Sequence, residues 1–251
     1  MRFRLKAFGL HLLGSASALS LTLGALYLWW YHWPGWYLAD VPHVIAVLVG
    51  VDVVLGPLLT LIIASPRKPR RELARDIAMI VAVQLAALGY GATSLWNGRP
   101  LYYAFSENCL SIVQAYDFEP GSPELARAHN AALAPHWYSL PRWVWAPLPK
   151  NTEDAAKIMQ SAIQGGFDVT ARPQYYRPWA DGAFDLRTQL KRIDDIKFFT
   201  GAEKKLLRRR MAAAGFSPDQ ANGLALTGRA RPLLAVFDPK SLRILAYLEP
   251  N

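Results

Sequence analysis

The residue with the clearest chemical potential in this sequence is Asp52, a lone carboxylate inside a long apolar run. Residues 41–66 contain no other Asp, Glu, Lys or Arg. Counted along a helix from Val41, Asp52 lies about 15 Å into the run, near its middle. A carboxylate in such a setting needs polar partners. It predicts either a site that grips a polar group of another helix or a structural hydrogen bond that fixes helix packing.

Depth along the neighbouring apolar runs predicts the partners of Asp52. The preceding run reaches the same level near Ser17 and Ser20, and the following run reaches it near Gln84. We therefore expect these polar side chains to meet Asp52 inside a helical bundle, where they either order the bundle or contact a partner helix.

His11 and Thr60 form a second predicted level, about one helical turn from the basic end of the first run. No second His, Cys or carboxylate lies at that level, so His11 is interpreted as a hydrogen-bonded residue and not as a metal ligand. Gly56-Pro57 lies between the two levels. The proline removes a backbone hydrogen bond and predicts a helix kink just below Asp52.

Three apolar runs must position these residues. Residues 7–39 and 77–98 contain no Asp, Glu, Lys or Arg. Like the run around Asp52, each exceeds the roughly 20 helical residues that cross a bilayer. Residues 1–98 are therefore predicted to form a three-span transmembrane bundle. The predicted spans are about 8–31, 43–65 and 76–97.

The basic residues predict the orientation of these spans. All Lys and Arg residues of the first 96 positions lie within 2–6 and 67–75, and the connector 33–43 has none. Basic flanks stay in the cytoplasm, which predicts a cytoplasmic N-terminus and an extracytoplasmic C-terminal part. The first run can also be a cleaved signal peptide. Its length and its ending in Tyr27–Tyr31, instead of small residues, favour an uncleaved anchor.

Aromatic residues cluster where the first predicted span ends. Such rings anchor helices at the boundary between lipid headgroups and acyl chains. We predict an outer-interface belt here, with a ligand-binding aromatic cage as the alternative. The tryptophans of the belt are Trp29, Trp30, Trp33 and Trp36.

Residues 99–251 show short amphipathic elements that predict a C-terminal extracytoplasmic α+β domain with a small antiparallel sheet. Two hairpins are expected, the first with its turn at 106–108. Residues 118–150, rich in Pro, Gly and aromatic residues, are expected to be irregular. The expected strands are 101–105, 109–115, 232–237 and 242–248, and the expected helices begin near 152, 184, 202 and 217.

Composition excludes several classes of protein. A content of 52% hydrophobic residues with 9 Trp, 11 Tyr and 10 Phe excludes a disordered chain. A single Cys excludes a disulfide framework. No GxSxG, HExxH or P-loop motif occurs, so no catalytic residue, metal site or cofactor is predicted. The basic segment 204–210 is expected outside the membrane, where it has no nucleic acid to bind.

Several segments resemble one known family. The Asp52-x-x-Leu-Gly-Pro57 core and its surroundings look like the TfpX/TfpZ family of type IV pilin accessory proteins. The resemblance covers roughly residues 5–105 and is loose beyond them. The matching segments are Lys6–Leu13, Gly50–Leu61, Asp76-Ile77, Gln84–Gly91 and Arg99-Pro100.

The resemblance implies a non-enzymatic protein of the bacterial inner membrane that assists type IV pilus assembly. Its expected partner is a cognate major pilin, met through its apolar membrane helix, its globular head or both. Other inner-membrane pilus assembly proteins and membrane lipids are further expected partners, and the outer domain is expected in the periplasm. The alternative is an envelope sensor with a periplasmic ligand-binding domain, although the predicted cytoplasmic segments are too short for an output domain.

Overall fold

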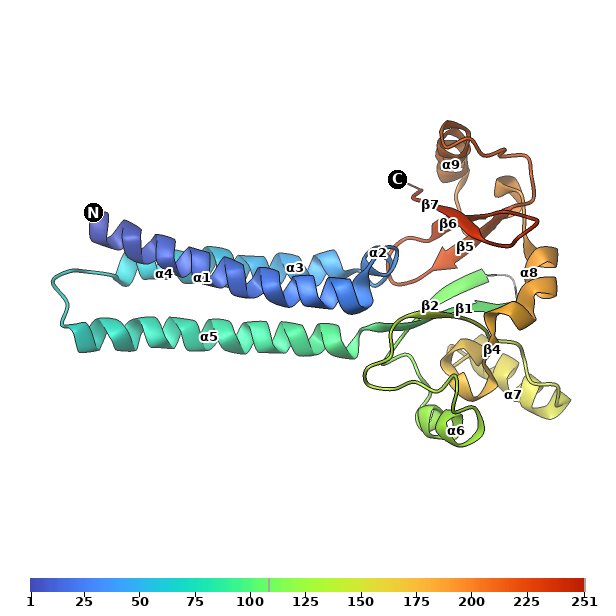
Figure 1. Ribbon diagram of the computed structural model, residues 1–251, viewed down its shortest axis with the longest axis horizontal. Helices are drawn as coiled ribbons and strands as arrows, with labels where there is room; N and C mark the ends of the chain where they lie inside the picture. The colour runs from blue at the N-terminus through green and yellow to red at the C-terminus, as the bar shows by residue number, and fades with distance from the viewer. Residues whose placement is uncertain (108, 251) are drawn as a thin grey trace. The chain divides into compact units, whose positions relative to one another are not determined.

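The computed structural model describes residues 1–107 and 109–250, which fall into two compact units (Figure 1). Met1–His32 and Asp40–Gly98 form the first unit, the helical bundle. Trp33–Ala39 and Arg99–Asn251 form the second unit, the sheet domain. The short segment 33–39, which the sequence placed with the spans, therefore belongs to the sheet domain.

The helical bundle contains three rods that lie side by side (Figure 1). Each is long and apolar enough to cross a membrane. The second rod changes from α to π geometry and back, and Pro57 stands where the α-helix resumes. The rods are α1 (Arg2–Leu26) with the π-helix η1 (Tyr27–Tyr31); α3 (Val41–Leu48), the π-helix η2 (Val49–Leu55) and α4 (Gly56–Ile63); and α5 (Arg70–Asn97).

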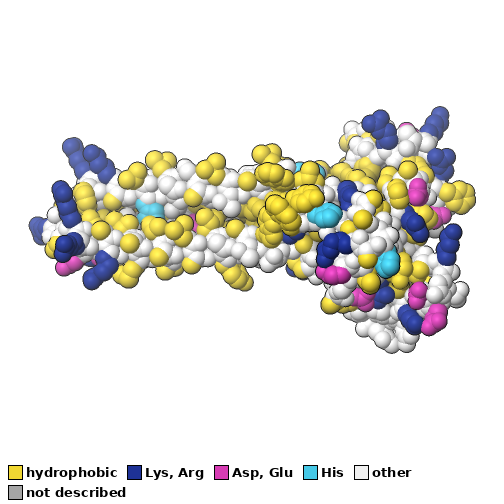
Figure 2. All heavy atoms as spheres, turned by 60° about the horizontal axis from the view of Figure 1, so that its bottom comes forward, with side chains coloured by type: hydrophobic (Ala, Val, Ile, Leu, Met, Phe, Trp, Pro, Cys, Tyr) yellow, Lys and Arg dark blue, Asp and Glu magenta, His cyan; other side chains and the backbone are white. Residues whose placement is uncertain are grey.

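Close contacts near one end hold the three rods together. The Tyr31 hydroxyl donates a hydrogen bond to the Leu95 carbonyl at 2.7 Å, which joins the first rod to α5. Gly91 of α5 lies so close to the second rod that an added Cβ would be 2.5 Å from Leu48 Cδ2. At the other end of the bundle Lys and Arg side chains gather (Figure 2), in accord with the basic segments 2–6 and 67–75.

The sheet domain is built on seven strands in the order β4-β3-β1-β2-β5-β6-β7. The pairs β1–β3 and β2–β5 are parallel, and the other pairs are antiparallel. The prediction of a small antiparallel sheet was therefore wrong in size and in type. The strands are β1 (Pro100–Ser106), β2 (Cys109–Gln114), β3 (Arg142–Trp145), β4 (Arg177–Pro178), β5 (Gly223–Thr227), β6 (Leu233–Phe237) and β7 (Ile244–Leu248).

The sequence missed β3, β4 and β5, and both β3 and β5 pair with a strand far along the chain. β3 lies in the segment 118–150 that the sequence predicted to be irregular, and it joins β1 with Tyr103 opposite Trp143. β5 joins β2 with Leu110 opposite Leu226. Parallel neighbours have no hairpin turn between them, so no local turn signal marks β3. β5 does have a local partner, because the short connection 228–232 joins it antiparallel to β6, but the sequence analysis placed no strand before that turn. The predicted first turn includes Asn108, which lies outside the described residues.

In the described part of the sheet domain five α-helices accompany the sheet, and two of them have side-chain N-caps. Asn151 accepts a hydrogen bond from the Glu153 amide at the start of α7, and Thr200 forms a capping box with Glu203 at the start of α9. The helix expected at about 184–196 is α8, which ends at Gln189 because Lys191 pairs with Gly223. The segment from Ser217 forms turns and no helix. The helices are α2 (Gly35–Leu38), α6 (Ser122–His129), α7 (Thr152–Ile163), α8 (Ala183–Gln189) and α9 (Gly201–Ala213).

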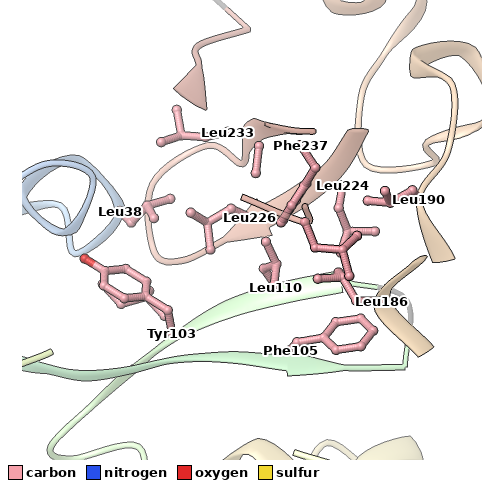
Figure 3. Close-up of a cluster of buried hydrophobic side chains, with 13 residues drawn as sticks. Leu38, Tyr103, Phe105, Leu110, Leu186, Leu190, Leu224, Leu226, Leu233 and Phe237 are labelled. Carbon is pink, nitrogen blue, oxygen red and sulfur yellow. The ribbon is translucent and has the colours of Figure 1, made fainter. Parts of the chain in front are cut away.

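Apolar side chains cover both faces of the sheet. Alternate strand residues point to opposite faces, and one face packs against α8 and α2 in the cluster drawn in Figure 3, which includes Phe105, Phe237 and Leu186. The other face packs against Ile158 of α7 and, in a separate cluster, against Leu207 of α9.

The segment 33–39 contributes a core residue to the first of these faces. Leu38 is fully buried among the strand leucines (Figure 3). Its carbonyl accepts hydrogen bonds from the amides of Arg229 and Ala230, at 2.7 and 3.2 Å. A Cβ on Gly228 would lie 2.5 Å from that carbonyl oxygen, so the turn after β5 closes tightly over Leu38. The chain between the first two rods is thus part of the sheet domain's core.

Candidate functional site

Three polar side chains form a hydrogen-bonded chain inside the helical bundle. His11 comes from α1, Thr60 from α4 and Gln84 from α5. The two ring nitrogens of His11 have different partners: Nδ1 lies 2.5 Å from Thr60 Oγ1 and Nε2 lies 2.6 Å from Gln84 Oε1. Because both ring nitrogens are engaged, His11 is a structural link between the three rods and has no nitrogen left for a metal.

Gln84 is the centre of this network. Its amide nitrogen donates to the backbone carbonyl of Asp52 at 2.8 Å and to Ser15 Oγ at 3.3 Å. Gly56 makes this position possible, because a Cβ there would lie 2.1 Å from Gln84 Nε2. The side-chain amide of Gln84 and the ring of His11 are thus fully engaged in hydrogen bonds within the bundle. They lie where α5 approaches the second rod at Gly56, so closely that a larger residue in place of Gly56 would not fit.

The Asp52 carboxylate stands apart from this network. The side chain is 3% exposed, and neither carboxylate oxygen has a hydrogen-bond partner among the described residues. Asp52 lies in the π-helical stretch η2, whose last turn is closed by the Gly56 amide bonding to the Val51 carbonyl. Buried polar groups in native proteins are almost always paired, and π-bulges occur frequently at functional sites. Both carboxylate oxygens of Asp52 are therefore available to accept a hydrogen bond from a donor outside the described residues.

A groove of about 390 Å³ contains these polar residues. One wall comes from α1 and the other from α5, with residues at the three- and four-residue spacing of a helix face. The buried Asp52 and Thr60 of the second rod lie between the walls, whereas Leu10 and Leu85 at the rim are 76% and 61% exposed. The lining residues of the walls are Ala7, Leu10, His11, Gly14, Ser15 and Ala18 on α1, and Ile77, Val81, Gln84, Leu85 and Leu88 on α5.

The predicted polar site is only partly assembled. His11, Thr60, Gln84 and Asp52 line the same groove, and Gly56-Pro57 marks the change from π to α geometry beside it. Ser17 and Ser20 are exposed and do not line the groove. Ser15 takes the place that the sequence gave to them. Ser17 and Ser20 were selected by their depth alone, but the face of α1 on which a serine lies determines whether it lines the groove. Ser15 follows His11 by four residues and therefore lies on the same face.

The tryptophans of the predicted belt divide between the two units. Trp30 is buried and packs edge to face on Trp96, with 5.0 Å between the ring centres. Trp29 is 57% exposed. Trp33 and the half-buried Trp36 belong to the sheet domain, where Trp33 lies 6.0 Å from the Tyr37 ring. Their role as an interfacial belt remains a prediction.

The sheet domain has polar groups of its own, including the buried Asn222, whose Oδ1 has no hydrogen-bond partner among the described residues. Arg208 of the basic helix forms ion pairs with Asp194 and with Asp219, so its charge is compensated within the domain, and Lys204 donates to the Asp194 backbone carbonyl. Burial raises the pKa of the half-buried Cys109 thiol. In the described residues no three His, Cys, Asp or Glu side chains are placed to hold a metal ion.

Comparison with known proteins gives the family. No model of a known protein family and no solved structure matches the chain. A fimbrial assembly protein of serogroup E1 from Dichelobacter nodosus is 26% identical over 254 residues, 98% of this chain and 95% of the relative. The same organism's fimbrial assembly protein of serogroups C1 and C2 is 30% identical over 115 residues, 46% of this chain and 88% of the relative. The chain belongs to the fimbrial assembly protein family.

The similarity to the fimbrial assembly proteins is not confined to one unit. The alignment with the serogroup E1 protein spans nearly the whole chain, so it includes both the helical bundle and the sheet domain. A third fimbrial assembly protein, from serogroup I, is 25% identical over 198 residues, 75% of this chain and 72% of the relative. These names support the family as a whole, and the TfpX/TfpZ subgroup remains a prediction.

Proposed function

We propose that this fimbrial assembly family member is an inner-membrane accessory protein that assists type IV pilus assembly by holding its cognate major pilin. The observation that carries the proposal is the similarity to a named fimbrial assembly protein over 98% of the chain. A name that denotes assembly favours a role without catalysis.

The arrangement of the chain supports a membrane position. Three rods have the length and composition of membrane spans. Their basic residues gather at one end of the bundle (Figure 2), which the positive-inside rule assigns to the cytoplasm. The chain enters the sheet domain from the opposite ends of the rods, through the segments 33–39 and 99–100. In this orientation the sheet domain lies in the periplasm.

A pilin subunit with an apolar membrane helix and a globular head would meet both units. The helical bundle offers a groove with a polar floor to the helix. The sheet domain offers its surface to the head. An accessory protein of this kind keeps the subunit in the membrane in a conformation ready for assembly, and it needs no bond-breaking chemistry.

Deleting the gene and restoring it on a plasmid tests the proposal. We expect the deletion strain to lose most surface pili in electron micrographs while its total pilin, measured by immunoblot, stays near normal, and we expect complementation to restore the pili. Unchanged piliation would refute the proposed function.

Cross-linking in intact cells separates the proposal from an envelope sensor. With photoreactive residues placed on the sheet domain, an assembly factor yields pilin as its main product. A sensor yields a cytoplasmic or periplasmic signalling partner and no pilin. An outer position such as Trp137, which is 70% exposed, suits the experiment, because replacing it removes little buried surface.

A further inference from the structure

We propose that the groove between α1 and α5 is the binding site for one transmembrane helix of a partner, and that Asp52 accepts a hydrogen bond from a single donor on that helix. The inference rests on the proposed function only in identifying the helix as that of pilin. It names the site, the residue and the chemistry of the ligand.

The shape of the groove fits a helix. Its wall residues run from Ala7 to Ala18 on α1 and from Ile77 to Leu88 on α5. Each wall therefore extends for about 16 Å of helix at 1.5 Å per residue. Two parallel helical ridges with a depression between them accept the ridge of side chains on a third helix. The rim is apolar and exposed, with Leu10 and Leu85 at 76% and 61% exposure, as a surface that packs against another helix requires.

The polar floor determines what that helix must carry. His11, Thr60 and Gln84 bond to one another, so their hydrogen-bonding capacity is largely used. Asp52 is different, because both of its carboxylate oxygens are buried and without a partner among the described residues. An ionised or neutral carboxyl group in the bilayer interior is costly without a partner. The missing partner is a hydrogen-bond donor, either a cationic group or a neutral hydroxyl or amide.

A helix is a better occupant than the alternatives. Asp52 lies near the middle of the span Val41–Ile63, far from the headgroups that carry the polar atoms of a lipid. An acyl chain would fill the apolar rim but would leave the carboxylate unpaired. A second copy of this chain would have to present the polar residues exposed on its own first span, such as Ser17 and Ser20. The experiment distinguishes these cases.

Photocross-linking from the groove tests the site directly. A photoreactive amino acid replaces Leu85 at the rim or, as the matched control, Val83, which is 66% exposed on the same helix and does not line the groove. Leu10 and Leu13 form a second matched pair on α1. In membranes of piliated cells we expect pilin in the product from Leu85 and Leu10, and little from Val83 and Leu13.

Substitution of Asp52 tests the donor. The carboxylate bonds to no described residue of the bundle, so Asp52→Asn and Asp52→Leu preserve the internal network. An interhelical hydrogen bond of about 1–2 kcal/mol corresponds to a roughly five- to thirtyfold effect on binding. We expect Asp52→Leu to lower the cross-link yield at Leu85 by about that factor, while Ser17→Ala leaves it within twofold. Removing the donor on the pilin helix should cause no further loss in Asp52→Leu.

The outcomes separate this inference from the proposed function. Equal yields from Leu85 and Val83, an undiminished yield in both Asp52 variants, or a second copy of this chain as the main product would each overturn the helix site. The proposed function then still stands if the sheet domain cross-links to pilin and the deletion strain lacks pili. Normal membrane insertion of Asp52→Leu shows that a lost cross-link does not come from misfolding. The isosteric Asp52→Asn variant keeps an acceptor oxygen, so it should retain the cross-link yield with a neutral donor and lose it with a cationic donor.

Discussion

Leu38 lies between two candidate membrane spans, yet the structure gives it the role of a core residue in the sheet domain. Its side chain is completely buried in the cluster of Figure 3. Leu38→Ala removes most of that side chain and leaves the backbone carbonyl that accepts from Arg229 and Ala230. The substitution therefore measures how much the segment 33–39 stabilises the sheet domain by packing alone.

The expected cost follows from burial. Replacing a fully buried leucine by alanine lowers the free energy of unfolding by about 2–5 kcal/mol. Leu38 belongs to the same buried cluster as Leu226 and Leu233, which lie on two strands of the sheet. A packed core of this kind closes the space left by a removed side chain only in part. Amides that exchange only when the domain unfolds should then exchange about 30- to 4,000-fold faster, since about 1.4 kcal/mol is a factor of ten.

Hydrogen–deuterium exchange of the full-length protein in detergent micelles resolves this effect by segment. We expect faster exchange in peptides that contain β5 and β6, the strands beside Leu38. Leu140→Ala is the matched control in the same domain, because Leu140 is 53% exposed and lies outside the helices and strands. A change of no more than about 0.5 kcal/mol, or roughly twofold in exchange, is expected for it.

Unchanged exchange of β5 and β6 in Leu38→Ala would refute the assignment of the segment 33–39 to the sheet domain. Equal acceleration in Leu140→Ala would also contradict it, because the effect would then not depend on burial.

A further consequence concerns fragments of the protein. A fragment that begins at residue 99 lacks Leu38, so it should expose the apolar cluster and be less stable than one in which the segment 33–39 is fused or supplied as a peptide.

Three further predictions concern single residues. Gly56→Ala should displace Gln84 and lower the free energy of unfolding of the bundle by about 2 kcal/mol, since about 0.6 kcal/mol is lost for each of three interhelical hydrogen bonds. Thermal unfolding in detergent measures this loss. Gly50→Ala is the control and should stay near wild type, because open space surrounds Gly50. Cys109 should react with iodoacetamide more slowly in the folded than in the denatured protein at neutral pH, and faster as pH rises, because burial raises its pKa; equal rates would contradict this. Thr200→Ala should cost about 1 kcal/mol by removing the N-cap of α9, whereas Thr200→Ser should restore most of it in the same denaturation assay.

The sequence predicted the helical bundle well because apolar length is a strong signal. Each charge-free run forms a helical rod, although the first and third rods begin about six residues before the predicted spans, at Arg2 and Arg70. Gln84, selected by depth, lines the same groove as Asp52. Ser15 was missed because counting depth ignores which face of a helix turns inward. The spacing of His11 and Ser15, four residues apart, was the available signal. The π-helical stretch around Asp52 was not predicted, because π geometry is rare and occurs mostly as short bulges inside α-helices.

The sheet domain was predicted less well, for a different physical reason. Its hairpins, such as β1–β2 and β6–β7, carry local turn residues and were named correctly. The pairs β1–β3 and β2–β5 join segments that are far apart in the chain, as Ala104 opposite Val144 and Leu110 opposite Leu226 show. Such pairing depends on the whole domain, and so does the burial of Leu38. From hydropathy alone, Leu38 is predicted to lie in an interfacial loop.

The Asp52 carboxylate, which has no hydrogen-bond partner in the part of the chain that the structure describes, has a consequence for specificity. A helix without a donor can fill the apolar rim of the groove but leaves Asp52 unpaired, so it loses the hydrogen bond without losing the contact area. A helix with a donor at the wrong height along the groove loses it as well. Asp52 would thus select both the identity and the register of the bound helix. A buried polar group is well suited to this selection. The free energy lost when its partner is misplaced exceeds the difference in apolar contact energy between two helices of similar shape.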